Sequence, residues 1–330
     1  MKSIFHVHVR LWPLVFIIFF LFGCASSTNL RIRRAPEIDL SEVRYIRVEP
    51  FALTGSLDLK QYHEESFIIT IIIDILSDKY DKIARKNSEL SFLHQRELSN
   101  ELSRDGYYMV TLGREFDASL GGTISYTIKD DFDQEKRTDL NGKDYMTNLI
   151  KRTIECDVEL TVTDKNRDII GSSRFYLERT VDTENRDRYY LFQDLIEWEE
   201  LLQETIRETY LPIIQKVAPY YALEKRVFVK GESKLFKEAN KAAKNGDWER
   251  AFELWERAEQ SGNSLDKGAS LYNQAIFAEV EDRLDDALNL YQKAYDIARN
   301  SKWHRAISRT KSRIEEKERL EASDRFRESN

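Results

Sequence analysis

The C-terminal third of the chain repeats itself with a step of 36 residues. The segment GDWERAFELWERA at 246–258 returns as DRLDDALNLYQKA at 282–294. Four positions recur in register, pairing Ala239 with Ala275, Ala251 with Ala287, Trp255 with Tyr291 and Ala258 with Ala294. A fixed period of this length is typical of stacked helix pairs, whose small residues let helices cross closely. A generic pair of helical hairpins would share the helical periodicity and remains the alternative.

This pattern resembles the tetratricopeptide repeat, a helix–turn–helix unit of ~34 residues. The resemblance covers about residues 232–300, and the two extra residues fit the loop-forming connection at 261–268. Because about three units are needed to bury a repeat core, the apolar stripe of Trp303, Ile307 and Ile314 predicts a capping helix. The sequence therefore predicts an all-α repeat domain over 226–320 and a flexible tail over 321–330.

The tetratricopeptide resemblance also implies a partner-binding groove lined by the first helix of each unit. The expected groove residues are Phe236, Asn240, Lys244, Tyr272, Asn273, Ile276, Glu279, Arg305 and Arg309. Some arrays of this family grip a peptide carboxylate with asparagines and basic side chains, and Asn240 and Asn273 match two such positions. If the third step were 35 residues, Thr310 would take the small-residue position and both arginines would turn away. A mixed apolar–polar peptide groove and a purely structural stalk remain the alternatives.

The N-terminus has the parts of a secretory signal. Lys2 and Arg10 supply positive charge, and an apolar run follows at 11–22. A membrane-spanning helix needs ~20 apolar residues, so this run is short for a permanent span. A plain N-terminal anchor is the alternative.

The LFGC motif at 21–24 resembles the lipobox of bacterial lipoproteins, with Cys24 as the acyl acceptor. The resemblance implies a signal peptide over 1–23, palmitate-type acylation of Cys24 and a small, polar tether over 24–35. No aspartate follows Cys24, which by resemblance to known sorting patterns favours the outer membrane.

Residues 36–225 predict an α+β domain with a mixed sheet. Alternating or β-branched stretches predict strands at 43–49, 107–112, 119–128, 153–163 and 169–180. Helical spacing predicts helices at 89–104 and 190–217, the last kinked at Pro212. The apolar run from Phe67 could be a buried helix or a strand, and its continuation to Ile83 at helical spacing favours a helix. The turn at 164–168 predicts a hairpin between the last two strands.

This order of elements resembles the α/β domain of envelope lipoproteins of the curli-secretion and TolB N-terminal type. The resemblance rests on VEPF at 48–51, Asp105-Gly106, ASLGG at 118–122 and the hairpin centred on Asp164. The complete layout also resembles uncharacterised lipoproteins of the Bacteroidota, a family that implies no particular chemistry.

Composition and motifs argue against several functions. A net charge of −7 disfavours general nucleic-acid binding, which depends on Lys and Arg. Cys156 is expected to be a small core residue, and His63, His94 and His304 have no second histidine at metal-ligand spacing. The acidic stretch at 130–135 lacks the glycine of a calcium loop and is expected to be a solvated hairpin loop. We therefore expect no catalytic residue, metal or cofactor.

These features together predict a non-enzymatic, membrane-tethered adaptor. Its expected partners are the membrane, through the lipid, and an unidentified envelope protein or peptide. The alternatives are an envelope hydrolase acting on cell-wall material, which would need paired carboxylates in a cleft, and a subunit of an oligomeric secretion complex.

Overall fold

The computed structural model describes residues 27–59, 71–260 and 263–329, with side chains for all of these except residues 71–80. The chain forms two compact units. The helical unit contains residues 27–34 and 221–318, and the sheet unit contains residues 35–220 and 319–329. The predicted class, an α+β domain followed by a helical region, is confirmed.

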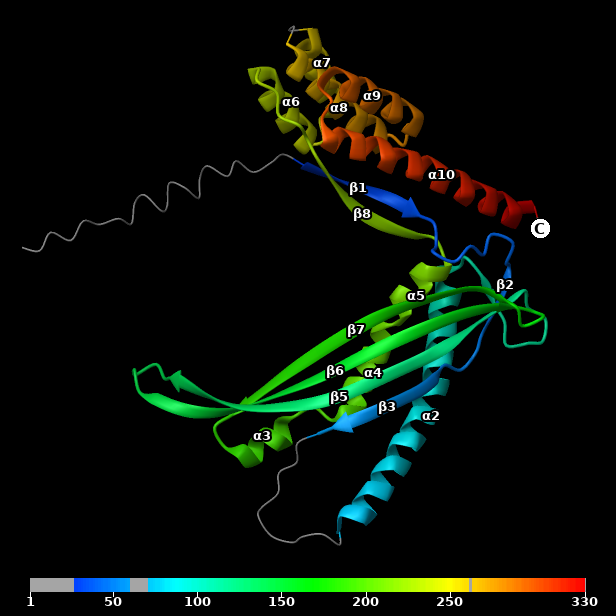
Figure 1. The fold of residues 1–330 in the computed structure, drawn as a ribbon, viewed down its shortest axis with the longest axis vertical. Coiled ribbons are helices and arrows are strands. Elements are labelled where there is room, and N and C mark those ends of the chain that lie inside the picture. The colour runs from blue at the N-terminus through cyan, green and yellow to red at the C-terminus, as the bar shows by residue number, and fades with distance from the viewer. Residues whose placement is uncertain (1–26, 60–70, 261–262, 330) are drawn as a thin grey trace, which may run out of the picture. The chain divides into compact units, whose positions relative to one another are not determined.

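The sheet unit is built on a mixed six-stranded sheet (Figure 1). Its strands are β2 (Tyr45–Val48), β3 (Ala52–Asp58), β4 (Met109–Val110), β5 (Ala118–Thr138), β6 (Asp144–Asp164) and β7 (Ile169–Asn185). Strands β5, β6 and β7 form an antiparallel meander, whereas β2 and β3 pair in parallel with successive parts of β5. The predicted hairpin at 164–168 is present as the turn between β6 and β7.

Helices cover one face of this sheet. They are α2 (Ile71–Asp105), α3 (Arg188–Asp194), α4 (Trp198–Glu208) and α5 (Tyr210–Val217). Side chains alternate between the two faces of β6, and the helices cover the apolar face. Ile154, Cys156 and Val158 are fully buried there, while the residues between them are half-buried. Cys156 is thus a core residue, as predicted, and burial raises the pKa of its thiol to about 12.

The helical unit consists of a two-stranded ribbon and helices packed in antiparallel pairs. Its elements are β1 (Ser27–Arg34), β8 (Tyr220–Val227), α6 (Lys234–Lys244), α7 (Trp248–Gln260), α8 (Ser264–Val280), α9 (Leu284–Ala298) and most of α10 (Ser301–Ser329). The small and aromatic residues that repeat at 36-residue spacing all lie in its core with no exposed surface: Ala239, Ala251, Trp255, Ala258, Ala275, Ala287, Tyr291 and Ala294.

The expected domain limits differ from the structure at both ends of the chain. Residues 27–34, expected to be tether, form β1, because Leu30 and Ile32 bury their side chains in the helical unit. The expected flexible tail is the end of α10, which belongs to the sheet unit and buries Ser323. The boundary expected at 225/226 lies at 220/221, since β8 pairs with β1.

Two predicted elements also change. The single helix over 190–217 is three helices, and Pro212 lies in the first turn of α5, where proline is tolerated. The acidic stretch at 130–135 is part of β5 instead of a loop. Asp130 is buried there because both of its carboxylate oxygens accept hydrogen bonds of 2.7 Å from Arg152. Among the residues described, no helix has the length and hydrophobicity that a membrane crossing requires.

Candidate functional site

The side-chain amides of two predicted groove residues hold a segment of the chain itself. Asn273 on α8 accepts a hydrogen bond from the backbone N–H of Val229 at 2.8 Å and donates one to the carbonyl of Val229 at 2.9 Å. Asn240 on α6 donates to the same carbonyl at 3.2 Å. These amides therefore bind an extended backbone, and the backbone is that of the connection between β8 and α6.

Aromatic packing fixes Phe228, the residue before Val229. The Phe228 ring lies 5.6 Å from the ring of Trp255 and 6.0 Å from that of Trp248, measured between centroids. The Trp255 indole N–H donates to Oδ1 of Asn240 at 3.0 Å, so the same tryptophan orients the amide.

Asp266 at the start of α8 holds the end of the same segment. Its carboxylate accepts hydrogen bonds from the backbone N–H groups of Glu232, at 2.7 Å, and Ser233, at 3.3 Å. Between these contacts lies Gly231, where an added Cβ would come within 2.2 Å of the Phe236 ring and 2.4 Å of Oδ1 of Asp266. Only glycine fits this passage of the chain over the helices.

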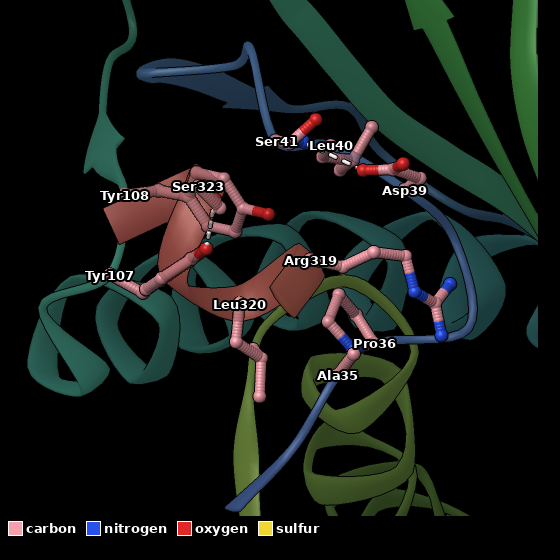
Figure 2. A pocket seen from close by; sticks show the side chains of 10 residues that line it. All are labelled: Ala35, Pro36, Asp39, Leu40, Ser41, Tyr107, Tyr108, Arg319, Leu320 and Ser323. Atoms are coloured by element: carbon pink, nitrogen blue, oxygen red, sulfur yellow. Dashed lines mark hydrogen bonds between the residues drawn. The ribbon is translucent and has the colours of Figure 1, made fainter. Parts of the chain in front are cut away.

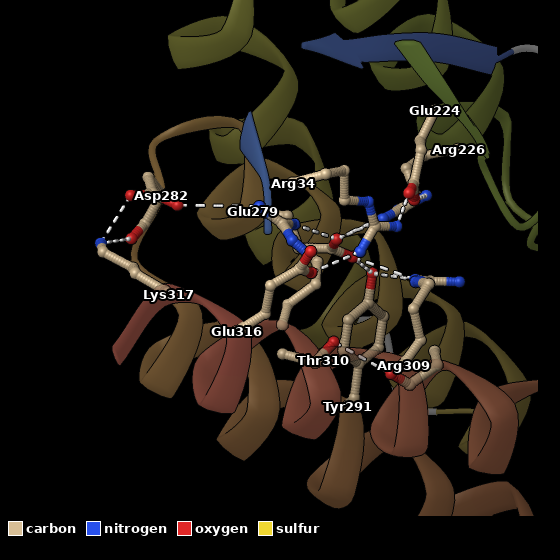
Figure 3. Close-up of polar contacts among 12 residues, drawn as sticks. Arg34, Glu224, Arg226, Glu279, Asp282, Tyr291, Arg309, Thr310, Glu316 and Lys317 are labelled. Carbon is tan, nitrogen blue, oxygen red and sulfur yellow. Dashed lines mark hydrogen bonds and ion pairs between the residues drawn. The ribbon is translucent and has the colours of Figure 1, made fainter. Parts of the chain in front are cut away.

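A buried carboxylate lies at the centre of a second polar cluster in the helical unit (Figure 3). Glu279 on α8 has no exposed side-chain surface. It accepts hydrogen bonds from Arg226 at 2.8 and 3.0 Å, Arg313 at 2.7 Å, Arg309 at 3.0 Å and the Tyr291 hydroxyl at 2.5 Å. Burial alone would raise the pKa of Glu279, but Arg226 and the other donors lower it to about 2.

Further acidic residues balance the arginines of this cluster. Glu224 pairs with Arg226 at 2.9 Å and also with Arg34 of β1, which in turn pairs with Glu316 at 2.6 Å. On the other side Asp282 pairs with Lys317 at 2.5 Å. Ion pairs thus join both ribbon strands to α8 and α10 within the helical unit.

The predicted groove residues do not form an open groove. Phe236 and Ile276 lie in the hydrophobic core, 2% and 0% exposed, because Gly231 and its neighbours cover α6 and because α8 is buried. Tyr272 is half-buried between the rings of Tyr291 and Trp303.

The basic groove residues are also separated. Lys244 and Arg305 are exposed, whereas Arg309 turns to Glu279. Thr310 is fully buried and Lys311 is exposed, which fits the 35-residue step for the third helix pair. Arg305 and Arg309 therefore do not lie together as carboxylate capture would require.

Glu279 was expected in the groove, and sequence reasoning missed Arg226 and Arg313 as its partners. One signal was present: Glu279 is the only charged residue in the run from 268 to 280, and an acid at such a position needs buried partners. Cys24, the predicted lipidation site, lies outside the described residues, as does His63.

In the sheet unit, the described titratable groups mainly make packing contacts and ion pairs that belong to the fold. His94 is fully buried between the rings of Phe51 and Tyr210, and burial lowers its pKa to about 4. Glu97 lines an open groove of about 560 Å³ between α2 and the α4–α5 region, where hydrogen bonding to Arg207 lowers its pKa. No group of three or more His, Cys, Asp or Glu among the described residues is placed to hold a metal ion.

A small pocket of the sheet unit adjoins the end of α10 (Figure 2). Its volume of about 20 Å³ is close to that of one water molecule. The Tyr107 hydroxyl contacts Oγ of Ser323 at 2.6 Å across it, and the Tyr108 hydroxyl donates to the carbonyl of Val217 at 2.5 Å. This pocket is a packing junction for the helix end.

Comparison with known proteins gives a family match and distant likenesses to solved structures. A family model described as a domain of unknown function, DUF6340, matches residues 237–322. No curated protein matches the sequence. A neuraminyllactose-binding hemagglutinin homolog from Helicobacter pylori has 13% identity and a TM-score of 0.27, over 56% of this chain and 90% of that one. Rare lipoprotein B from Shewanella oneidensis has 14% identity and a TM-score of 0.19, over 36% and 81%.

Proposed function

We propose that this chain is a lipid-anchored envelope lipoprotein that acts as a non-enzymatic scaffold through tetratricopeptide-type repeats. Its layout is that of the Bacteroidota-type lipoproteins, with acyl chains on Cys24 in the outer membrane. The observation that carries the scaffold proposal is the bidentate contact between the Asn273 amide and the backbone of Val229. An amide that pairs with both backbone groups of one residue can hold any extended peptide, whatever its side chains.

The occupant of this site is the chain's own segment 228–233. Phe228, Gly231 and the backbone groups around them fill the space that a bound peptide would otherwise take. We propose that a separate partner instead binds at the predicted groove residues that stay exposed, Lys244 and Arg305. Capture of a terminal carboxylate has less support, because Arg309 is already paired with Glu279.

Lipidation is tested by growing cells with a radioactive fatty acid. Wild-type protein should be labelled and Cys24→Ala protein should not. Equal labelling of the two proteins would remove the lipoprotein proposal.

Partner binding is tested in intact cells with a photo-crosslinking amino acid at Lys244 or at Arg305. The matched control is the same amino acid at Lys293, which is exposed on α9. Crosslinks from 244 and 305 but not from 293 are expected. Crosslinks from position 293 alone would place the binding face elsewhere, and none from any position would favour a structural stalk.

The hydrolase alternative has less support. A glycosidase acid needs a carboxyl group whose pKa is raised, with a second carboxylate nearby. Glu97 in the open groove and Glu279 in the buried cluster both have a lowered pKa because arginines bind them, and Asp105, whose pKa is raised by burial, lies in neither site. If the purified protein released soluble fragments from purified cell-wall material, the hydrolase would be favoured over the scaffold.

A further inference from the structure

The two strands of the helical unit expose an apolar stripe on their outer face. Leu30 and Ile32 of β1 are buried against the helical unit. On β8 the alternate residues point the other way, and Tyr221, Leu223 and Val227 are 60%, 74% and 46% exposed. An uncovered row of large apolar side chains marks an interaction surface more often than chance exposure does.

This face is also basic. Alternation places eight residues on it: Ser27, Asn29, Arg31, Arg33, Tyr221, Leu223, Lys225 and Val227. None of the eight is acidic, although the chain has 58 Asp and Glu against 51 Lys and Arg. The Arg31 guanidinium lies 4.3 Å from the centroid of the Tyr221 ring, which leaves its polar edge able to reach an anion. Glu224, the acidic residue of β8, lies on the opposite face, where it pairs with Arg34 and Arg226.

The position of the face in the sequence adds a second argument. Ser27, the first residue of β1, is the third residue after Cys24. Three residues span at most about 11 Å when fully extended. The headgroup layer of one leaflet is roughly 5–8 Å thick, so an acylated Cys24 keeps the start of β1 at the membrane surface.

We propose that the outer face of the β1–β8 ribbon rests on a bilayer that contains anionic phospholipids. Tyr221 lies at the headgroup level, as tyrosine does in membrane interfaces, and Leu223 and Val227 enter the acyl boundary. Arg31 and Lys225 contact lipid phosphates. The proposal rests on the lipid anchor proposed above and adds to it a second, orienting contact.

The test uses the full lipidated chain with Leu223→Cys, labelled with an environment-sensitive dye. The dye reacts at this position because Cys156 is buried and Cys24 is acylated. The protein is reconstituted in vesicles of phosphatidylethanolamine and phosphatidylglycerol, with or without nitroxide-bearing phospholipids. The matched control is Leu265→Cys, an exposed leucine at the start of α8.

The expected result is a blue shift of the dye at 223 and a loss of its emission in nitroxide vesicles, with neither effect at 265. The added pair Arg31→Glu and Lys225→Glu should reduce the loss of emission at 223, and an unchanged loss would remove the electrostatic contact. Protein that floats with vesicles but keeps its emission at 223 would overturn the ribbon contact and leave the anchor intact. A blue shift without loss of emission would mean that a second copy of the chain covers the face. If the purified chain is found to carry no fatty acid and does not float with the vesicles, the anchor is overturned, and the ribbon proposal with it.

Discussion

Asn273 uses both ends of one side-chain amide on a single backbone residue, Val229. Its replacement by alanine leaves the partly buried N–H of Val229 without its acceptor. We expect Asn273→Ala to lower the free energy of unfolding by about 1–3 kcal/mol, the cost of an unsatisfied buried group. Urea unfolding of the full chain, followed by circular dichroism, measures this loss.

The matched control is Asn289→Ala on α9, where the asparagine is exposed. This change should leave the urea midpoint nearly unaltered, since an exposed helical position favours alanine slightly. Equal effects of the two substitutions would mean that the contact with Val229 does not stabilise the fold.

Glu279 is the single carboxylate shared by Arg226, Arg309 and Arg313. Removing its charge takes away the buried carboxylate that these arginines share, and breaking a buried ion pair typically costs about 3–5 kcal/mol. We expect Glu279→Gln to destabilise the protein by about 3 kcal/mol at neutral pH. The exposed Glu256→Gln on α7 is the matched control and should have little effect.

The same residue predicts a pH dependence. The pKa of Glu279 falls from 4.5 to about 2 in the folded protein, so its contribution is complete above pH 4.5. That contribution is lost as the pH falls from about 4.5 to about 2. The free energy of unfolding of Glu279→Gln should therefore decline less over this interval than that of the wild type. Parallel declines would show that the carboxylate does not stay ionised in the folded state.

At the scale of elements, Arg327 makes the largest set of polar and aromatic contacts described for the end of α10. The Arg327 guanidinium lies 3.7 and 4.8 Å from the ring centroids of Tyr107 and Tyr108 and donates to the carbonyl of Tyr107 at 2.8 Å. We expect Arg327→Ala to destabilise the sheet unit by about 1–2 kcal/mol. Arg325→Ala, at an exposed position two residues earlier, should not. Thermal unfolding of both variants distinguishes them.

Strand β1 completes the helical unit from a distant part of the sequence. A fragment of residues 221–318 lacks the apolar side chains of Leu30 and Ile32. We expect a synthetic peptide of residues 27–34 to raise the melting temperature of this fragment, with a shift that grows as the logarithm of peptide concentration, as for a ligand of the folded state. A peptide with Ile32→Asp should give no shift. Absence of a shift with the natural peptide would mean that β1 adds no stability to the unit.

At the scale of the whole molecule, regular patterns predicted the parts of the fold that depend on nearby residues. The alanines at 36-residue spacing predicted the helix pairs α6–α9, because the close crossing of helices needs small residues at fixed intervals. The turn at 164–168 predicted the β6–β7 hairpin, and all five positions from Asp164 onward are polar. Two of the predicted groove residues, Asn240 and Asn273, do bind a polypeptide backbone.

The missed features depend on partners far away in the sequence. Asp130 looked solvated because its partner Arg152 lies 22 residues further on. Strand β1 looked like a polar tether because two apolar residues among arginines indicate a strand only when a partner strand is known. Likewise, nothing local to Asn273 shows that Val229, 44 residues before it, would be its ligand.

The pairing of Arg34 with Glu316 joins residues that are 282 positions apart in the sequence. At synthesis speeds of roughly 5–20 residues per second, β1 is made on the order of tens of seconds before the helix that Arg34 must reach. The contiguous strands β2–β7 can pair during that interval, whereas the helices that bury Leu30 and Ile32 have not yet been made. Among the strands that the structure describes, the earliest to be made is therefore among the last to be secured, and until then β1 is free to pair with the wrong sheet edge.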